Sequence, residues 1–236
     1  MVHIPPIGEN RTGLEVHPRR TAAMLAGVAE FGPTSRGSEE NLAQVRIAYI
    51  KEARPAGSMP PLPGKRPSED LVAFLDKLGA RLAFERGGVR LYEALLAKHR
   101  ALGSFDGGPS RADLEQIRDE EHQHFTILRR AVESLGGDST AITPSANIET
   151  TLAKGALAVV VDPRTRLYEA LHGSLVAELA DNESWDTLTH LARHSGFNDL
   201  AESFARALRQ EEVHLEKVRR WLAAGEGRAY GRGEHH

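Results

Sequence analysis

The segment Asp119-Glu120-Glu121-His122-Gln123-His124 has a counterpart near the other end of the chain, Gln210-Glu211-Glu212-Val213-His214-Leu215. Both contain the motif Glu-x-x-His, formed by Glu121 with His124 and by Glu211 with His214. Residues three apart on an α-helix are neighbours on its surface. Each motif is therefore expected to present a carboxylate and an imidazole on one face of a helix.

That face is predicted to be the buried one. Apolar residues recur every three or four positions around both motifs, which is the pattern of a buried helical stripe. They are Leu114, Ile117, Leu128, Ala131 and Leu135 around the first motif, and Leu200, Phe204, Ala207, Val218 and Trp221 around the second. The glutamates and histidines of the motifs occupy positions in these stripes. Because a buried carboxylate is costly unless something pairs with it, the pattern suggests a bound metal.

A single carboxylate interrupts each of two further apolar stripes. Glu85 stands in the stripe of residues 71–99 and Glu178 in that of residues 167–192. Glu85 precedes Glu121 by 36 positions, and Glu178 precedes Glu211 by 33. The near-equal separations indicate two similar helical hairpins related by a duplication.

An aromatic residue, Tyr92 or Trp185, follows each of these single glutamates by seven positions. Each is interpreted either as a core aromatic or as a partner of a carboxylate.

The periodicity predicts an all-α fold, a four-helix bundle of two hairpins joined by a long crossover. Capping signals set the expected helix starts. The four helices are expected from Ser68 to the turn at Gly103, from Ser110 to Gly136-Gly137, from Asp162-Pro163 to Gly196, and from Asn198 or Asp199 to about Ala224. The crossover, residues 138–161, contains an apolar piece, 152–161, that fits a helix or a strand equally well.

The remaining residues are expected to lie outside the bundle, which is predicted to span residues 68–224. Residues 1–67 are rich in Pro and Gly, and we interpret them as an N-terminal arm with one short helix in 39–53 and a proline-rich connector. The arm is expected to lie over the main domain or to exchange with a partner subunit. Residues 225–236 are expected to form a flexible tail.

Composition excludes several classes of function. A net charge of -3 over 236 residues argues against non-specific nucleic-acid binding. The absence of cysteine excludes thiolate zinc sites and cysteine-ligated iron–sulfur clusters. No apolar run approaches the roughly 20 residues of a membrane span, and the short apolar segment after Arg19-Arg20 is a poor export signal. We expect a cytoplasmic protein with no nucleic-acid or membrane partner.

The inward-facing polar residues form a ligand set for two divalent ions. Carboxylates can bridge two ions, and oxygen with imidazole suits iron or manganese. The candidate metal ligands are Glu85, Glu121, His124, Glu178, Glu211 and His214. Two alternatives stay open at this point. Glu120 can replace Glu121 by pairing with His124 at i, i+4, or the polar side chains can merely hydrogen-bond one another.

Residues 68–224 resemble the ferritin-like superfamily, and most closely the rubrerythrin-like di-iron proteins. The resemblance is carried by Glu85 with Tyr92, the two Glu-x-x-His motifs, and Glu178. It implies two iron ions, with manganese possible, that react with dioxygen or hydrogen peroxide in ferroxidase or peroxide-scavenging chemistry. It also implies bridging by Glu121 and Glu211, terminal binding by Glu85 and Glu178, one metal for each histidine, a hydrogen bond from Tyr92 to a carboxylate, and a homodimer.

The chain departs from rubrerythrins in two respects. It lacks the cysteines of a rubredoxin-type iron site, so an external electron donor is expected. Asp181 stands where rubrerythrins carry a second glutamate. The aspartate side chain has a shorter reach toward a metal, which argues against peroxidase-type chemistry. Two other functions remain open, a non-enzymatic iron-binding or storage protein and a structural bundle that no longer uses its metal.

The pair Gly87-Gly88 follows Glu85 directly. It is expected to leave room for a small oxidant, to allow a kink, or to allow a close helix crossing.

Overall fold

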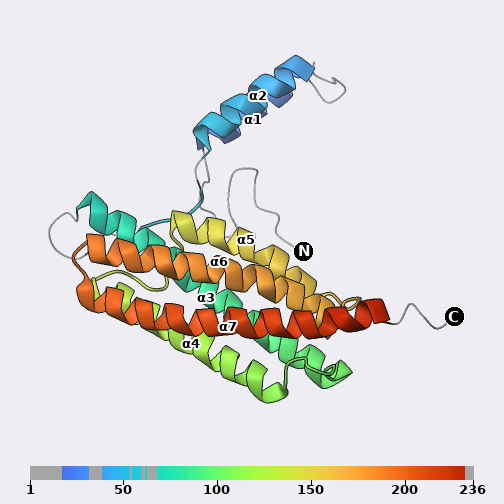
Figure 1. Ribbon diagram of the computed structural model, residues 1–236. Coiled ribbons are helices and arrows are strands. Elements are labelled where there is room, and N and C mark those ends of the chain that lie inside the picture. Colours follow the sequence, from blue (N-terminus) through green and yellow to red (C-terminus); the bar gives the residue numbers. More distant parts are fainter. Residues whose placement is uncertain (1–17, 32–38, 54, 60–61, 63–67, 232–236) are drawn as a thin grey trace, which may run out of the picture. The chain divides into compact units, whose positions relative to one another are not determined.

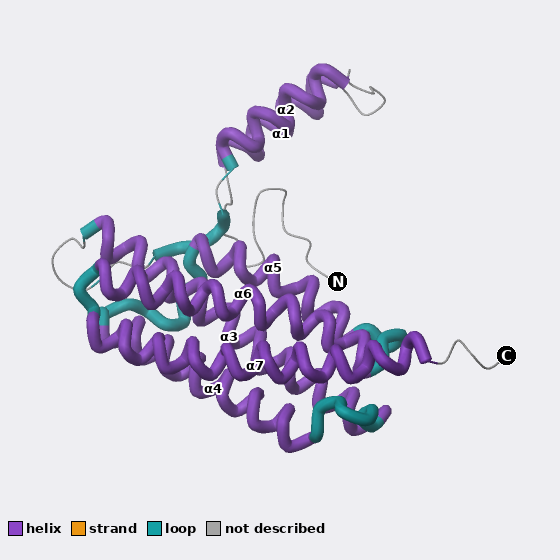
Figure 2. Tube along the Cα trace, in the orientation of Figure 1, coloured by secondary structure: helices purple, strands orange, loops and turns teal. Residues whose placement is uncertain are grey.

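The structure is a computed structural model that describes residues 18–31, 39–53, 55–59, 62 and 68–231. All secondary-structure elements in these residues are helices (Figures 1 and 2). They are α1 (Pro18–Phe31), α2 (Glu39–Glu52), α3 (Glu69–Leu102), α4 (Arg111–Ser134), α5 (Pro144–Val161), α6 (Leu167–His194) and α7 (Asn198–Gly231). None of the described helices combines the length and the apolar character needed to cross a lipid bilayer.

The chain divides into two compact units, Met1–Ala56 and Gly57–His236. The first unit contains α1 and α2. Helix α2 confirms the short helix expected in residues 39–53, whereas α1, which includes Arg19-Arg20, was not expected as a helix. Residues 54, 60–61 and 63–67 of the predicted proline-rich connector, residues 54–67, lie outside the described residues.

Capping side chains set the starts of α3 and α4, as the sequence predicts. The Ser68 hydroxyl accepts a hydrogen bond from the Leu71 amide at 3.2 Å. Ser110 and Asp113 form a reciprocal capping box, in which the Asp113 amide donates to the Ser110 hydroxyl at 3.1 Å and the Ser110 amide donates to the Asp113 carboxylate at 3.2 Å. These bonds satisfy amide groups that a helix start leaves without partners.

Helix α5 fills most of the crossover, so its apolar piece is helical. It starts after Thr143, whose hydroxyl accepts from the Ala146 amide at 3.3 Å. The prediction that Asp162 caps the third long helix is wrong, because the Asp162 amide donates to Ala158 and ends α5 instead. The Asp162 carboxylate accepts from the Arg164 amide at 2.9 Å and forms a turn, and α6 begins only at Leu167.

Helix α7 continues to Gly231, past the predicted end at Ala224. The predicted tail is therefore wrong for residues 225–231, and residues 232–236 lie outside the description. Gly225 is buried against α6, where an added Cβ atom would meet the Tyr168 ring at 2.2 Å. This close packing supports the helix at a residue type that otherwise weakens helices.

Two apolar clusters lie along α3, α4, α6 and α7, one on each side of a polar layer. One cluster contains Phe74, Leu78, Leu128, Trp185 and Phe204, and the other contains Leu95, Ile117, Leu171, Val218 and Trp221. Along α3 and α7 the first cluster precedes the polar residues, and along α4 and α6 it follows them. Helices α3 and α7 therefore run in one direction and α4 and α6 in the opposite one (Figure 1).

Replacing the N-cap of α4 tests the capping interpretation. Ser110→Ala removes the acceptor for the Asp113 amide and is expected to lower the free energy of unfolding by about 1 kcal/mol, equivalent to roughly 2–4 °C in Tm for a chain of this size. Thermal unfolding followed by circular dichroism measures the shift. Ser104→Ala, in the preceding turn, is the control and should leave Tm unchanged. An equal effect of both substitutions would contradict the capping role.

Candidate metal centre

Seven polar side chains from four helices converge in the layer between the two apolar clusters. Each is at most 2 % exposed. They are Glu85 from α3, Glu121 and His124 from α4, Glu178 and Asp181 from α6, and Glu211 and His214 from α7. All six residues that the sequence singles out as ligands are thus brought together, and Asp181 joins them.

These side chains form three overlapping groups, in each of which the ligand atoms lie within 4.8 Å of one another. The first contains Glu121, Glu178, Glu211 and His214, and the second contains Glu85, His124 and Glu211. The third contains Glu85, Glu121, Asp181 and Glu211. Glu211 belongs to all three, so the arrangement can hold two ions that share one carboxylate. We call the first two groups the His214 position and the His124 position.

Several ligand atoms in this layer have no hydrogen-bond partner. They are Glu85 Oε2, Glu121 Oε2, Glu178 Oε2, Glu211 Oε1 and His124 Nδ1. His124 Nδ1 lies 2.6 Å from Glu211 Oε1 without the alignment of a hydrogen bond. Buried polar atoms are nearly always satisfied. The residues present therefore fit a cation, because these atoms have no hydrogen-bond partner and their residues form groups whose ligand atoms lie within 4.8 Å of one another.

The electrostatics of the layer show that its carboxylates oppose one another. Burial, with the negative charge of Glu211, raises the pKa of Glu178 to about 8. Burial also raises the pKa of Glu121 well above its ordinary value, and the charges of Glu211 and Glu85 add to this shift. Glu211 differs, because its contacts with His124 and His214 outweigh its burial and lower its pKa to about 2.

Each histidine presents Nδ1 to the carboxylates and Nε2 to a residue outside the cluster. His214 Nε2 lies 2.7 Å from Glu120 Oε2, and His124 Nε2 lies 3.0 Å from Gln210 Oε1. Such partners orient metal-binding imidazoles and adjust their basicity. The alternative that Glu120 replaces Glu121 is therefore not supported by the geometry, since Glu120 contacts the far nitrogen of His214.

Tyr92 makes the kind of hydrogen bond expected of it. Its hydroxyl donates to Glu178 Oε1. Burial and the neighbouring Glu178 raise the pKa of the Tyr92 phenol, so this group keeps its proton. Trp185, by contrast, packs as a core aromatic, with its ring centroid 5.5 Å from that of His124.

Arg81 is a member of the site that the sequence analysis missed. Its buried guanidinium donates to Glu85 and to Asp181 and so joins α3 to α6. Asp181 is therefore held by an ion pair within the cluster. The signal that could have identified Arg81 is its position four residues before Glu85, the spacing of a helical ion pair.

Gly88 leaves room for the Glu121 side chain, a role that the interpretations of Gly87-Gly88 from the sequence did not include. A Cβ atom added at Gly88 would lie 2.1 Å from Glu121 Oε2, an impossible distance. A Cβ atom added at Gly87 would meet only Ala153, at an ordinary 3.8 Å.

Other polar residues that resemble ligands lie outside the cluster. Glu212, His122, His172, His190 and His194 are exposed to solvent, and His99 is half-buried.

Comparisons of the chain with protein-family models, with characterised proteins and with solved structures gave no significant match.

A matched pair of glycine substitutions tests the geometry at α3. Gly88→Ala is expected to displace the Glu121 carboxylate and to weaken metal binding by at least about tenfold, the size of effect typical of disturbed metal-site geometry. Gly87→Ala is expected to leave binding unchanged and to stabilise the helix by up to about 1 kcal/mol. Metal titration by calorimetry, with Tm measured for both variants, distinguishes them. Equal metal affinities would contradict the assigned role of Gly88.

The pKa of Glu178 predicts how the metal-free protein responds to pH. A carboxyl group whose pKa rises on folding binds its proton more tightly in the folded state. Its stabilising contribution is present below the unfolded value of 4.5 and is lost as the pH rises through about 8. The free energy of unfolding of metal-free protein, measured in urea, should fall between pH 5 and pH 8.5. Glu178→Gln should flatten this dependence, and an unchanged slope in that variant would contradict the assignment.

Proposed function

We propose that this chain is a ferritin-like dinuclear metal protein, with iron as the first candidate and manganese as the alternative. We further propose that it reacts with dioxygen or hydrogen peroxide as an oxidoreductase of the ferroxidase or peroxide-scavenging type. One observation carries the proposal. Four buried glutamates and two buried histidines face one another across the bundle, and several of their ligand atoms have no protein partner.

The charge of the layer supports two divalent ions. Five carboxylates and the guanidinium of Arg81 leave four negative charges when both histidines are neutral. Two divalent cations balance these charges. A single cation would leave two negative charges in an environment where burying even one unpaired charge is costly.

The direction of the helices supports the ferritin-like part of the proposal. A Glu from each of two helices and Glu-x-x-His from each of the others, on a bundle with one long crossover, is the pattern of ferritin-like di-iron and di-manganese proteins. In this chain α4 and α6 run in the same direction, and the crossover between them contains α5. The resemblance to rubrerythrin-like proteins rests on the same residues.

The side chains around the ligands have separate tasks in this proposal. A bound pair of redox-active ions would supply electrons two at a time, so that an oxidant is reduced without release of radicals. Tyr92 holds Glu178, Arg81 holds Glu85, and the two apolar clusters exclude bulk water. Electrons must come from an external donor, because the chain has no cysteine for a second iron site.

Metal counting with ligand variants tests the site. Protein loaded anaerobically with Fe(II) is expected to hold two ions per chain. His214→Ala, which removes one ligand of the His214 position, should reduce the count and abolish most of the rise in Tm that metal produces by binding the folded state. His122→Ala, an exposed neighbour on α4, is the control and should bind normally. An empty centre at excess Fe(II) or Mn(II) would refute the metal site, and many ions per chain would favour storage.

Oxidation of the loaded centre tests the reaction. Stopped-flow absorbance after mixing the Fe(II) protein with dioxygen or hydrogen peroxide should show oxidation faster than that of free Fe(II). Oxidation no faster than free iron with both oxidants would contradict the oxidoreductase. A structural bundle without metal predicts that Glu121→Ala leaves stability unchanged or raises it, since that variant removes a buried polar group.

A further inference from the structure

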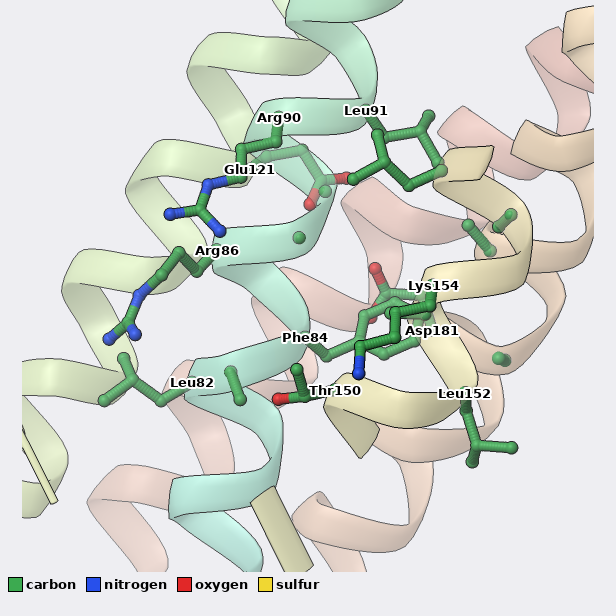
Figure 3. A pocket seen from close by; sticks show the side chains of 18 of the residues that line it. Leu82, Phe84, Arg86, Arg90, Leu91, Glu121, Thr150, Leu152, Lys154 and Asp181 are labelled. Carbon is green, nitrogen blue, oxygen red and sulfur yellow. The ribbon is translucent and has the colours of Figure 1, made fainter. Parts of the chain in front are cut away.

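A cavity of about 510 Å³ lies between α3, α5 and α6 (Figure 3). Small-molecule sites typically enclose about 300–1,000 Å³, so this cavity has the size of an organic ligand. Dioxygen and hydrogen peroxide each have two heavy atoms and do not need a chamber of this volume.

Small side chains create the space. Gly87 and Gly88 line it from α3, Ala153 and Ala156 from α5, and Ala177 from α6. Larger apolar residues complete the wall, among them Leu91 and Leu157. The wall is therefore predominantly apolar and formed by facing positions on three helices.

The inner end of the cavity reaches the candidate metal centre. Glu121, Glu178, Asp181 and Tyr92 belong to its lining, and each is at most 2 % exposed. The Oε2 atoms of Glu121 and Glu178 have no hydrogen-bond partner. Both glutamates belong to the His214 position, whereas Glu85 and His124 are not part of the lining. The cavity thus approaches the centre from one side.

The charges at the outer part of the cavity have the opposite sign. Its exposed charged lining residues, Arg86, Arg90 and Lys154, are all cations. Arg86 lies over the Phe125 ring of α4, with its guanidinium carbon 5.5 Å from the ring centroid. Figure 3 shows the Lys154 side chain extending from α5 toward α3, while both arginines extend from α3 away from α5. Lys154 is the cation best placed to meet a ligand in the cavity.

We propose that this cavity binds an organic substrate, a mostly apolar molecule that carries one anionic group. The apolar part fills the space between the three helices and faces the His214 position, and the anionic group pairs with Lys154 at the mouth. In the metal-free protein, a ligand in the opposite orientation would place its negative charge against the carboxylates of the centre, so the charge distribution there favours this direction of binding. This inference rests on the proposed function only in that the bound molecule would meet the metal centre.

Calorimetric titration of the full chain with decanoate tests the proposal, and 1-decanol is the uncharged probe. Wild-type protein is expected to bind one decanoate and to bind 1-decanol more weakly. Ala153→Trp fills the cavity beside Gly87 and should weaken decanoate binding more than about tenfold. Ala158→Trp lies on the exposed side of α5, outside the lining, and should bind like wild type. Lys154→Met should weaken decanoate binding by about two- to fivefold, the range of an exposed ion pair, and leave 1-decanol binding unchanged.

Any of three results would overturn the proposal. Absence of decanoate binding, or equal binding by Ala153→Trp, would refute the cavity as the site. Equal affinities for the two probes, with no effect of Lys154→Met, would refute the anionic group. Metal counts on the same samples distinguish failure of this proposal from failure of the proposed function. Two ions per chain without decanoate binding would refute the cavity proposal but not the metal site. Decanoate binding by protein that takes up no metal would refute the metal site but not the cavity as a binding site.

Discussion

The structure depends on one electrostatic constraint, the burial of five carboxylates in a single layer of an apolar bundle. Such a layer is stable only if cations or protons neutralise it. Each of the four helices must therefore change from apolar to acidic at the same height, and the helix directions make these heights coincide. The apolar clusters on either side of the layer stabilise the bundle through burial. They also lower the local polarity, and low polarity makes unneutralised carboxylates costly.

The layer could be predicted from the sequence because charged residues stand at positions where the helical pattern requires apolar ones. Glutamates at stripe positions are conspicuous, and capping residues such as Ser110 mark helix starts through local hydrogen bonds. The missing parts depend on tertiary contacts. From the sequence, Asp162 fits the start of one helix as well as the end of the preceding one. The hydrogen bond from its amide to the Ala158 carbonyl places it at the end of α5. The extension of α7 past Ala224 needs the packing of Gly225 on Tyr168. Arg81 stands at the helical spacing of an ion pair with Glu85, but its second contact, with Asp181 on α6, depends on the tertiary fold.

The two hairpins differ where they surround the layer. Relative to the single glutamates, Arg81 on α3 corresponds in position to Ser174 on α6, and Gly88 corresponds to Asp181. Helix α3 thus contributes a cation and a glycine, whereas α6 contributes a small hydroxyl group and an anion. The pairs are complementary, since Arg81 reaches across to Asp181 while Gly88 leaves space for Glu121. Two identical hairpins would place the same groups on both sides and could not join α3 to α6 in this way.

The same asymmetry makes the two candidate metal positions inequivalent. His214 is backed by the carboxylate of Glu120, and His124 by the neutral amide of Gln210. A carboxylate partner makes an imidazole a stronger electron donor than an amide does. The His214 position also contains Glu178, which accepts a hydrogen bond from Tyr92, and two of its glutamates line the cavity beneath α5. The His124 position lies instead beside Arg81, which holds Glu85 from the same helix. Binding of a substrate would therefore act first on the His214 position, and the His124 position would remain enclosed by protein.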